Sequence, residues 1–144
     1  MSAEPSSRPV SLGLRVTALV YDLLPLLGLW FLAGVVGVAV TGGAFDPHRL
    51  DHKILMQTFL LAFSAGYFVI SWSRGGQTIG MRAWKMRLTM QDGSRLAWPR
   101  ALLRFFLACV SLALLGIGFW WSLFDPQRRT LYDVISETRM SRLG

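Results

Sequence analysis

Three long stretches of the chain carry no charged residue, and their lengths point to a fold class. Residues 23–40, 54–72 and 105–124 are uncharged runs of 18, 19 and 20 residues. Because a helix rises about 1.5 Å per residue, roughly 20 apolar residues cross the hydrocarbon core of a bilayer. The pattern predicts an all-α membrane protein, a single domain over residues 1–144, with helical segments at about 16–40, 54–72 and 102–124.

The third segment differs from the other two in its glycines and in the charges around it. Gly116 and Gly118 weaken a continuous helix, so the segment is either one span or a bent, re-entrant element. Basic residues favour the cytoplasmic side of a membrane. A full crossing leaves nine basic residues inside and six outside, whereas a bend leaves thirteen inside and two outside. The count favours the bend, in a multi-pass protein of the cytoplasmic (inner) cell membrane with a cytoplasmic amino terminus.

The polar loop before the third segment has the pattern of a small cytoplasmic β-hairpin at about residues 82–98. Residues 84–90 alternate apolar and polar side chains, as a strand does, and Asp92-Gly93 is favoured in two-residue hairpin turns. Gly75 and Gly76 are placed to end the preceding helix, because glycine is the usual residue of a left-handed cap, and Pro99 suits the first turn of the next helix.

Basic side chains on and beside this hairpin are candidates for contact with lipid head groups or a membrane partner. The alternative is a basic juxtamembrane loop without a special partner, because the positive-inside rule alone enriches such loops. The candidate contact residues are Arg82, Lys85, Arg87, Arg100 and Arg104.

Composition excludes several other classes of protein. Hydrophobic residues make up 53% of the chain and charged residues 16%, against about 25% charged in average soluble domains. A disordered chain is therefore excluded, and the composition argues against an ordinary soluble enzyme. The net charge of +7 comes without a nucleic-acid-reading motif, so we expect no nucleic-acid partner. Cys109 is the single cysteine, and His48 and His52 have no third strong ligand nearby, so we expect neither a metal site nor a cofactor.

Two charged residues of the first helix, Arg15 and Asp22, stand two helical turns apart and so share one face. A carboxylate at membrane depth normally faces a bundle interior and finds a partner there. Arg15 is one candidate partner, and Arg104 and Arg128 are others. Because the axial gap between Arg15 and Asp22 is about 10 Å, a direct pair requires the arginine to reach along the helix.

Asp22 has two interpretations, one chemical and one structural. Pro25 lacks an N–H and frees the carbonyl of Tyr21, which beside a carboxylate makes a candidate cation or proton site. Alternatively, Asp22 only fixes helix packing. Asp133 is the second aspartate of interest, since it follows Arg128-Arg129 and is placed to pair with one of those two arginines or to cap a cytoplasmic element.

Four stretches, taken in order, resemble the RDD family of small membrane proteins, named for one arginine and two aspartates. They are residues 15–22 (RVTALVYD), 76–82 (GQTIGMR), 92–93 with 98–104 (DG, WPRALLR), and 124–138 (FDPQRRTLYDVISET). The resemblance implies that Arg15, Asp22 and Asp133 are the signature residues. Family members often end in an apolar, strand-like tail, and the charges within residues 137–140 argue against such a strand here.

The residues and the resemblance together leave two functions open, neither of them enzymatic, because no nucleophile–base pair is visible. The first is ion- or proton-coupled transport, with Asp22 as the titrating or coordinating group and Arg15 as its counter-charge. It requires a homo-oligomer because three short segments do not readily enclose a pathway. The second is a non-catalytic accessory or assembly protein, in which the buried charges specify packing. Its partners are membrane lipids and a second copy or another membrane protein.

Overall fold

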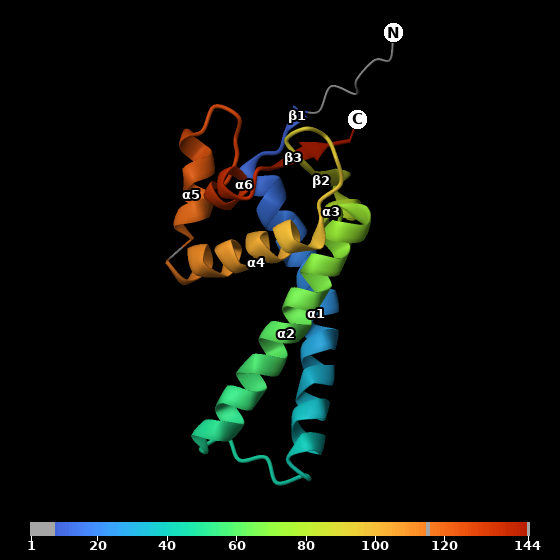
Figure 1. Ribbon diagram of the computed structural model, residues 1–144, viewed down its shortest axis with the longest axis vertical. Helices are drawn as coiled ribbons and strands as arrows, with labels where there is room; N and C mark the ends of the chain where they lie inside the picture. The colour runs from blue at the N-terminus through green and yellow to red at the C-terminus, as the bar shows by residue number, and fades with distance from the viewer. Residues whose placement is uncertain (1–7, 115, 144) are drawn as a thin grey trace. The chain divides into compact units, whose positions relative to one another are not determined.

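Two long apolar helices, α1 (Leu12–Val40) and α2 (Leu50–Gly75), contain the first two segments expected from the sequence (Figure 1). Both are long and apolar enough to cross a membrane. Only 17% of the most apolar window of α1, and 0% of that of α2, is buried within the chain. Core helices of soluble proteins bury such surface, so these helices indicate a membrane location.

The computed structural model describes residues 8–114 and 116–143, and the chain divides into two units. Leu23–Tyr67 forms one, here called the hairpin unit, and Met1–Asp22 with Phe68–Gly144 forms the other, the terminal unit. Within the hairpin unit, the indole nitrogen of Trp30 in α1 donates to Ser64 Oγ in α2 at 2.8 Å.

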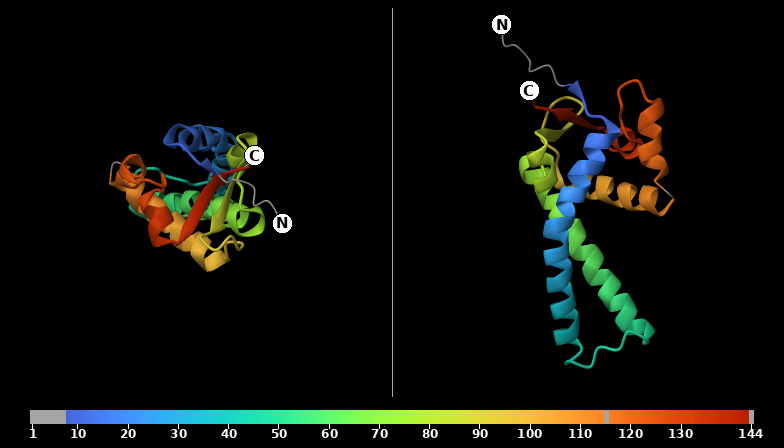
Figure 2. Two further views of the ribbon diagram at one scale, coloured as in Figure 1. Left: turned by 90° about the horizontal axis from the view of Figure 1, so that it is seen from above. Right: turned by 180° about the vertical axis from the view of Figure 1, so that it is seen from behind.

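The third apolar segment is two short helices, α4 (Trp98–Ala113) and α5 (Ile117–Phe124), with Gly116 between them. Gly116 has a left-handed φ of +73°, and its N–H donates to the carbonyl of Ser111 at 2.8 Å. In Figures 1 and 2, α5 turns away from the axis of α4 at this point. Their 16 and 8 residues extend about 24 and 12 Å, less than the roughly 30 Å of a hydrocarbon core. The bend is confirmed, a continuous helix over residues 102–124 is not formed, and the depth of the segment stays a prediction.

A three-stranded antiparallel sheet lies in the terminal unit and corrects the expected hairpin at 82–98 (Figure 2). Its strands are β1 (Arg8–Pro9), β2 (Met86–Met90) and β3 (Thr138–Arg142), in the order β1-β3-β2. A turn does form after β2, where Gly93 has a φ of +84°. However, the chain enters α4 at Trp98 with a proline in its first turn, so β2 pairs with β3 instead.

β3 also corrects the expectation that charge prevents a terminal strand. Side chains alternate across a strand, and here Thr138 is buried and Met140 half-buried on one face, whereas Arg139 on the other face is exposed, and Arg142 is exposed at the end of the strand. Met140 pairs with Leu88, which belongs to the core. The arginines therefore lie where water or head groups reach them, and strand pairing does not require them to be apolar.

Of the two glycines expected to end α2, Gly75 is its last residue and Gly76 takes the left-handed conformation, with a φ of +65°. Gly76 also lies against β2, because its carbonyl accepts from Leu88 N at 2.7 Å and a Cβ on Gly76 would come within 2.6 Å of the Leu88 carbonyl oxygen. The terminal unit contains two further short helices, α3 (Ile79–Ala83) and α6 (Leu131–Ile135). Around them the core of the terminal unit consists of Val10, Ala18, Trp72, Met81, Met86, Leu88, Leu96 and Ala101.

Candidate functional site

Asp133 holds the start of α6 in a reciprocal cap. Thr130 is the N-cap residue, and its Oγ1 accepts from Asp133 N at 3.4 Å, while Asp133 Oδ2 accepts from Thr130 N at 3.0 Å. Each side chain thus satisfies a backbone donor that a helix end leaves open. The sequence signal was present in Thr-x-x-Asp, although the expectation of a capping role named only Asp133.

Two arginines meet the Asp133 carboxylate from elsewhere in the chain, and they are not the neighbouring Arg128 or Arg129 that the sequence led us to expect. Arg15 Nη1, from the first turns of α1, lies 2.7 Å from Asp133 Oδ2, and Arg104 Nη1, from α4, pairs with Asp133 Oδ1. The three residues are 4%, 0% and 1% exposed, in the order Arg15, Asp133 and Arg104. We call these residues the charge cluster. It contains two guanidinium groups and one carboxylate, so its formal charge is +1.

Two aromatic rings replace part of the hydration that the Arg104 guanidinium loses by burial. Its guanidinium carbon lies 5.1 Å from the ring centroid of Trp72 and 4.8 Å from that of Tyr132, within the range of cation–π attraction. Arg104 Nη1 also donates to Thr138 Oγ1 at 2.9 Å. Arg104 therefore ties α4 to α6 and β3, and it is not on the surface where we expected it to contact lipid.

The charges around Asp133 determine how its protonation affects stability. Burial on its own raises the pKa of the carboxyl, but the positive charges of Arg104 and Arg15 outweigh it, and the pKa lies below its ordinary value of 3.8. A carboxyl whose pKa is lower in the folded than in the unfolded state stabilises the fold above its unfolded pKa. That contribution is lost as the pH falls through the folded pKa.

We therefore expect acidification from neutral pH to about pH 5 to leave this contribution intact, and further acidification below about pH 4 to remove it. Thermal unfolding of the purified protein across this range is the measurement. Because other carboxyls titrate in the same pH range, the wild type is compared with Asp133→Asn. The melting temperature of this variant should fall less steeply below about pH 4 than that of the wild type. Parallel curves for the two proteins would show that Asp133 does not contribute to acid lability.

Asp22 contacts the start of α3 rather than the charge cluster. Its Oδ2 accepts from Thr78 Oγ1 at 2.7 Å and its Oδ1 from Gly80 N at 2.8 Å, and the residue is 1% exposed. Arg15 was expected as the counter-charge of Asp22, and this expectation is wrong, because Arg15 bonds to Asp133 and to the carbonyl of Arg128. Asp22 thus joins α1 to the GQTIGMR stretch after α2.

The other candidate basic residues have different surroundings. Arg82, Lys85 and Arg87 are exposed on α3, β2 and the turn between them, so contact with lipid or a partner stays a prediction for them. Arg100 is partly exposed and lies 3.3 Å from Glu137.

The remaining polar candidates do not gather into a metal site among the described residues, where no group of three His, Cys, Asp or Glu side chains occurs. His52 Nδ1 accepts from Asp46 N at 2.9 Å, and its ring stacks on Phe45. This histidine therefore orders the loop between α1 and α2.

Sequence reasoning did not find the partners of the signature charges. Thr78 and Gly80 had no signal of their own, because nothing local shows that they lie against α1. Arg104 did have a signal in the sequence. The small residues Ala101, Ala108 and Ser111 lie on the same side of its helix, so this face has little side-chain volume. A long charged residue within such a stripe of small residues indicates that the helix packs closely there and that the charged end of the side chain is buried.

One comparison with known proteins finds a match. Residues 9–137 match the model of the RDD family, which confirms the resemblance of the four stretches. No curated protein and no solved structure matches the chain.

Proposed function

The chain belongs to the RDD family, and from this premise we propose that it is a non-catalytic accessory or assembly protein of the cytoplasmic membrane. The carrying observation is that each signature charge is engaged within the terminal unit. Arg15 and Asp133 bond to each other, and Asp22 bonds to Thr78 and Gly80. A coordinating or titrating group in a pathway needs access to its ion, whereas these side chains hold helices and loops together.

The distribution of charge supports an orientation for this protein. The hairpin unit has two basic and two acidic residues, while the rest of the chain has thirteen basic and six acidic residues. The whole net charge of +7 therefore belongs to the unit that holds both ends of the chain. By the positive-inside rule this unit lies at the cytoplasmic leaflet and the loop of the hairpin unit lies outside.

Exposed apolar side chains on α4 and α5 support a position of these helices in the membrane interface. Trp98 and Phe106 on α4, and Trp120 and Phe124 on α5, are each at least 60% exposed. Tryptophan is enriched where the acyl region meets the head groups, and helices with one apolar face lie in that plane. Arg82, Lys85 and Arg87 then supply attraction to anionic head groups.

The exposed faces of α1 and α2 provide the surface for a protein partner. Most of their apolar side chains are uncovered within the chain, and helices in a bilayer associate by close packing rather than by hydrophobic exclusion from water. We propose that a second copy of this chain, or another membrane protein, packs there.

Asp22→Asn in sealed proteoliposomes tests the accessory role against transport. We expect the substitution to lower the unfolding free energy by about 2 kcal/mol, because the hydrogen bonds from Thr78 and Gly80 lose a charged acceptor. We also expect wild-type vesicles to show no pH- or cation-driven flux above protein-free vesicles. The measurements are thermal unfolding, membrane accumulation and flux.

Asp46→Asn is the matched control, since Asp46 belongs to the polar loop between α1 and α2. It should accumulate like the wild type. A flux in wild-type vesicles that Asp22→Asn abolishes, while accumulation and stability stay normal, would overturn the accessory role and establish transport.

A further inference from the structure

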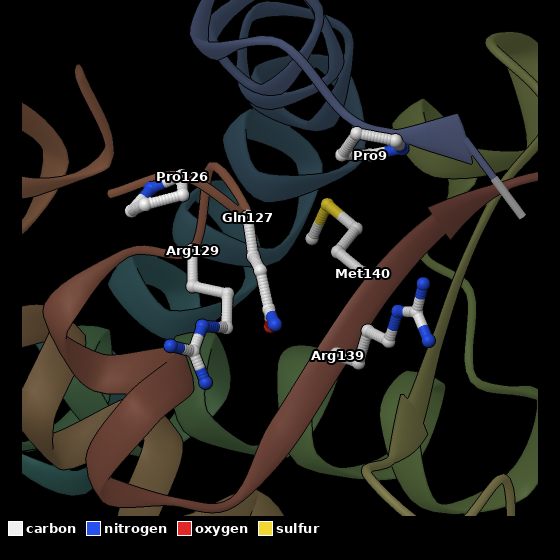
Figure 3. A pocket seen from close by; sticks show the side chains of 6 residues that line it. All are labelled: Pro9, Pro126, Gln127, Arg129, Arg139 and Met140. Carbon is white, nitrogen blue, oxygen red and sulfur yellow. The ribbon is translucent and has the colours of Figure 1, made fainter. Parts of the chain in front are cut away.

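A small pocket in the terminal unit is lined by the loop before α6 and by strands β1 and β3 (Figure 3). Its volume is about 220 Å³, below the roughly 300–1,000 Å³ of drug-sized ligand sites. Figure 3 shows Gln127 between Arg129 on one side and Met140 and Arg139 on the other. The lining residues are Pro9, Pro126, Gln127, Arg129, Arg139 and Met140, none of them acidic.

The two arginines reach the pocket from rigid surroundings. Arg139 belongs to β3 and pairs with Thr89 of β2. Arg129 is held by Asp125, whose carboxylate accepts from Arg129 N at 2.7 Å and from Nε at 3.1 Å. Asp125 contacts the Nε and Nη2 side of this guanidinium, which leaves Nη1 for another acceptor.

The charge cluster fixes the loop that carries these groups. Arg15 Nη2 donates to the carbonyl of Arg128 at 3.2 Å, and Asp133 accepts from Thr130 N at 3.0 Å. The backbone is thus held on both sides of Arg129. Arg128 itself has a φ of +52°, a conformation that persists in a residue with a side chain only where its surroundings impose it.

We propose that this pocket binds a phosphate group, either in a lipid head group or as a free phosphate ester, between Arg129 and Arg139 with the Gln127 amide as a third donor. Guanidinium groups match phosphate oxygens in geometry and bind them by charge-assisted hydrogen bonds. Arg139 lines the pocket and is exposed, and its side chain makes no hydrogen bond or ion pair within the described chain, so its charge is available. The limited volume favours a head-group-sized occupant.

This site goes beyond the accessory role, because it assigns a ligand to a defined pocket rather than to a basic surface. It also gives the signature residues a second consequence. Arg15 and Asp133 act as positioning residues for the phosphate-binding loop, without touching the ligand themselves.

Arg139→Gln and Arg142→Gln in the full-length protein form the test. Both remove one exposed arginine from β3, but only Arg139 lines the pocket. In detergent, inorganic phosphate and glycerol phosphate are titrated against chloride at constant ionic strength, with thermal unfolding as the readout. In nanodiscs, phosphatidylcholine bilayers are compared with bilayers that also contain phosphatidylglycerol.

We expect Arg139→Gln to weaken phosphate binding about tenfold, the effect of one charged hydrogen-bonding partner, and Arg142→Gln to leave it unchanged. A difference between the variants in the soluble titration identifies a free phosphate ester, and a difference only in the anionic nanodiscs identifies a lipid head group. Gln127→Ala should weaken binding in the same arm as Arg139→Gln. If Arg139→Gln and Arg142→Gln bind phosphate equally, both in detergent and in nanodiscs, the proposed phosphate site is wrong. The basic side chains then act only through their positive charge.

Discussion

Replacing Asp133 with asparagine is expected to lower the free energy of unfolding by about 3–5 kcal/mol, the effect of removing one partner from a buried ion pair. The new amide would retain a polar contact to the loop but would leave Arg15 and Arg104 without a carboxylate. Both guanidinium groups are almost completely buried, and their Nε atoms already have no hydrogen-bond partner within the described chain. The expected result is a variant that accumulates poorly in the membrane and unfolds at a markedly lower temperature.

The matched control is Asp51→Asn, which breaks an ion pair of similar length at the surface. Arg49 Nη2 and Asp51 Oδ2 lie 2.7 Å apart, but the side chains are 60% and 61% exposed. Solvent screens such pairs, so we expect no measurable change. Unfolding in detergent micelles compares the two variants, and similar stabilities for Asp133→Asn and Asp51→Asn would show that the charge cluster does not stabilise the fold.

A triple replacement separates the penalty of unpaired charge from the net contribution of the cluster. Arg15→Met, Arg104→Met and Asp133→Leu together remove every charge, and apolar replacement of a buried ionic group is often neutral or stabilising. We expect the triple variant to recover most of the stability that Asp133→Asn loses. Such a recovery would assign the cluster to specifying how α1, α4 and α6 pack, since its net energy would then be small.

Local signals in the sequence account for the helices and their ends. The two spanning segments follow from uncharged length alone, and the break at Gly116 follows from the conformational freedom of that glycine. Gly76 and Pro99 were informative for the same reason, since each restricts or permits one backbone conformation at its own position. For these features the neighbouring residues contain all the information that is needed.

Pairings between distant residues were not accessible in this way. β2 has a hairpin turn directly after it, yet it pairs with residues 138–142, about fifty positions later. The residues directly after the turn do not form a strand paired with β2, because Leu96 is buried and the chain starts α4 two residues later. The small residues beside Arg104 indicate close packing, but they do not identify its partners. Its burial is favourable because Trp72, Tyr132 and Asp133 approach it from other parts of the chain.

The second large effect is expected from a methyl group at Gly80. This glycine belongs to α3 and lies against α1, where a Cβ would come within 1.9 Å of the Ala18 carbonyl oxygen and 3.0 Å of Asp22 Cγ. Backbone atoms cannot rotate away as a flexible side chain does, so α3 must move off α1. That movement also breaks the hydrogen bond from Gly80 N to Asp22. Overpacking alone costs about 1–3 kcal/mol, and with the lost bond to a charged acceptor we expect Gly80→Ala to lose about 3–5 kcal/mol.

Gly28→Ala is the matched control, because Gly28 lies inside α1 and a Cβ there meets nothing within 4 Å. Alanine should stabilise that position by about 0.5–1 kcal/mol, so the two substitutions are expected to shift thermal unfolding in opposite directions. The double variant Gly80→Ala with Asp22→Ala should lose less than the sum of the single variants, because both remove the same hydrogen bond. Strict additivity would mean that the clash with Ala18 acts alone, and equal stability of Gly80→Ala and Gly28→Ala would contradict the close approach of α3 to α1.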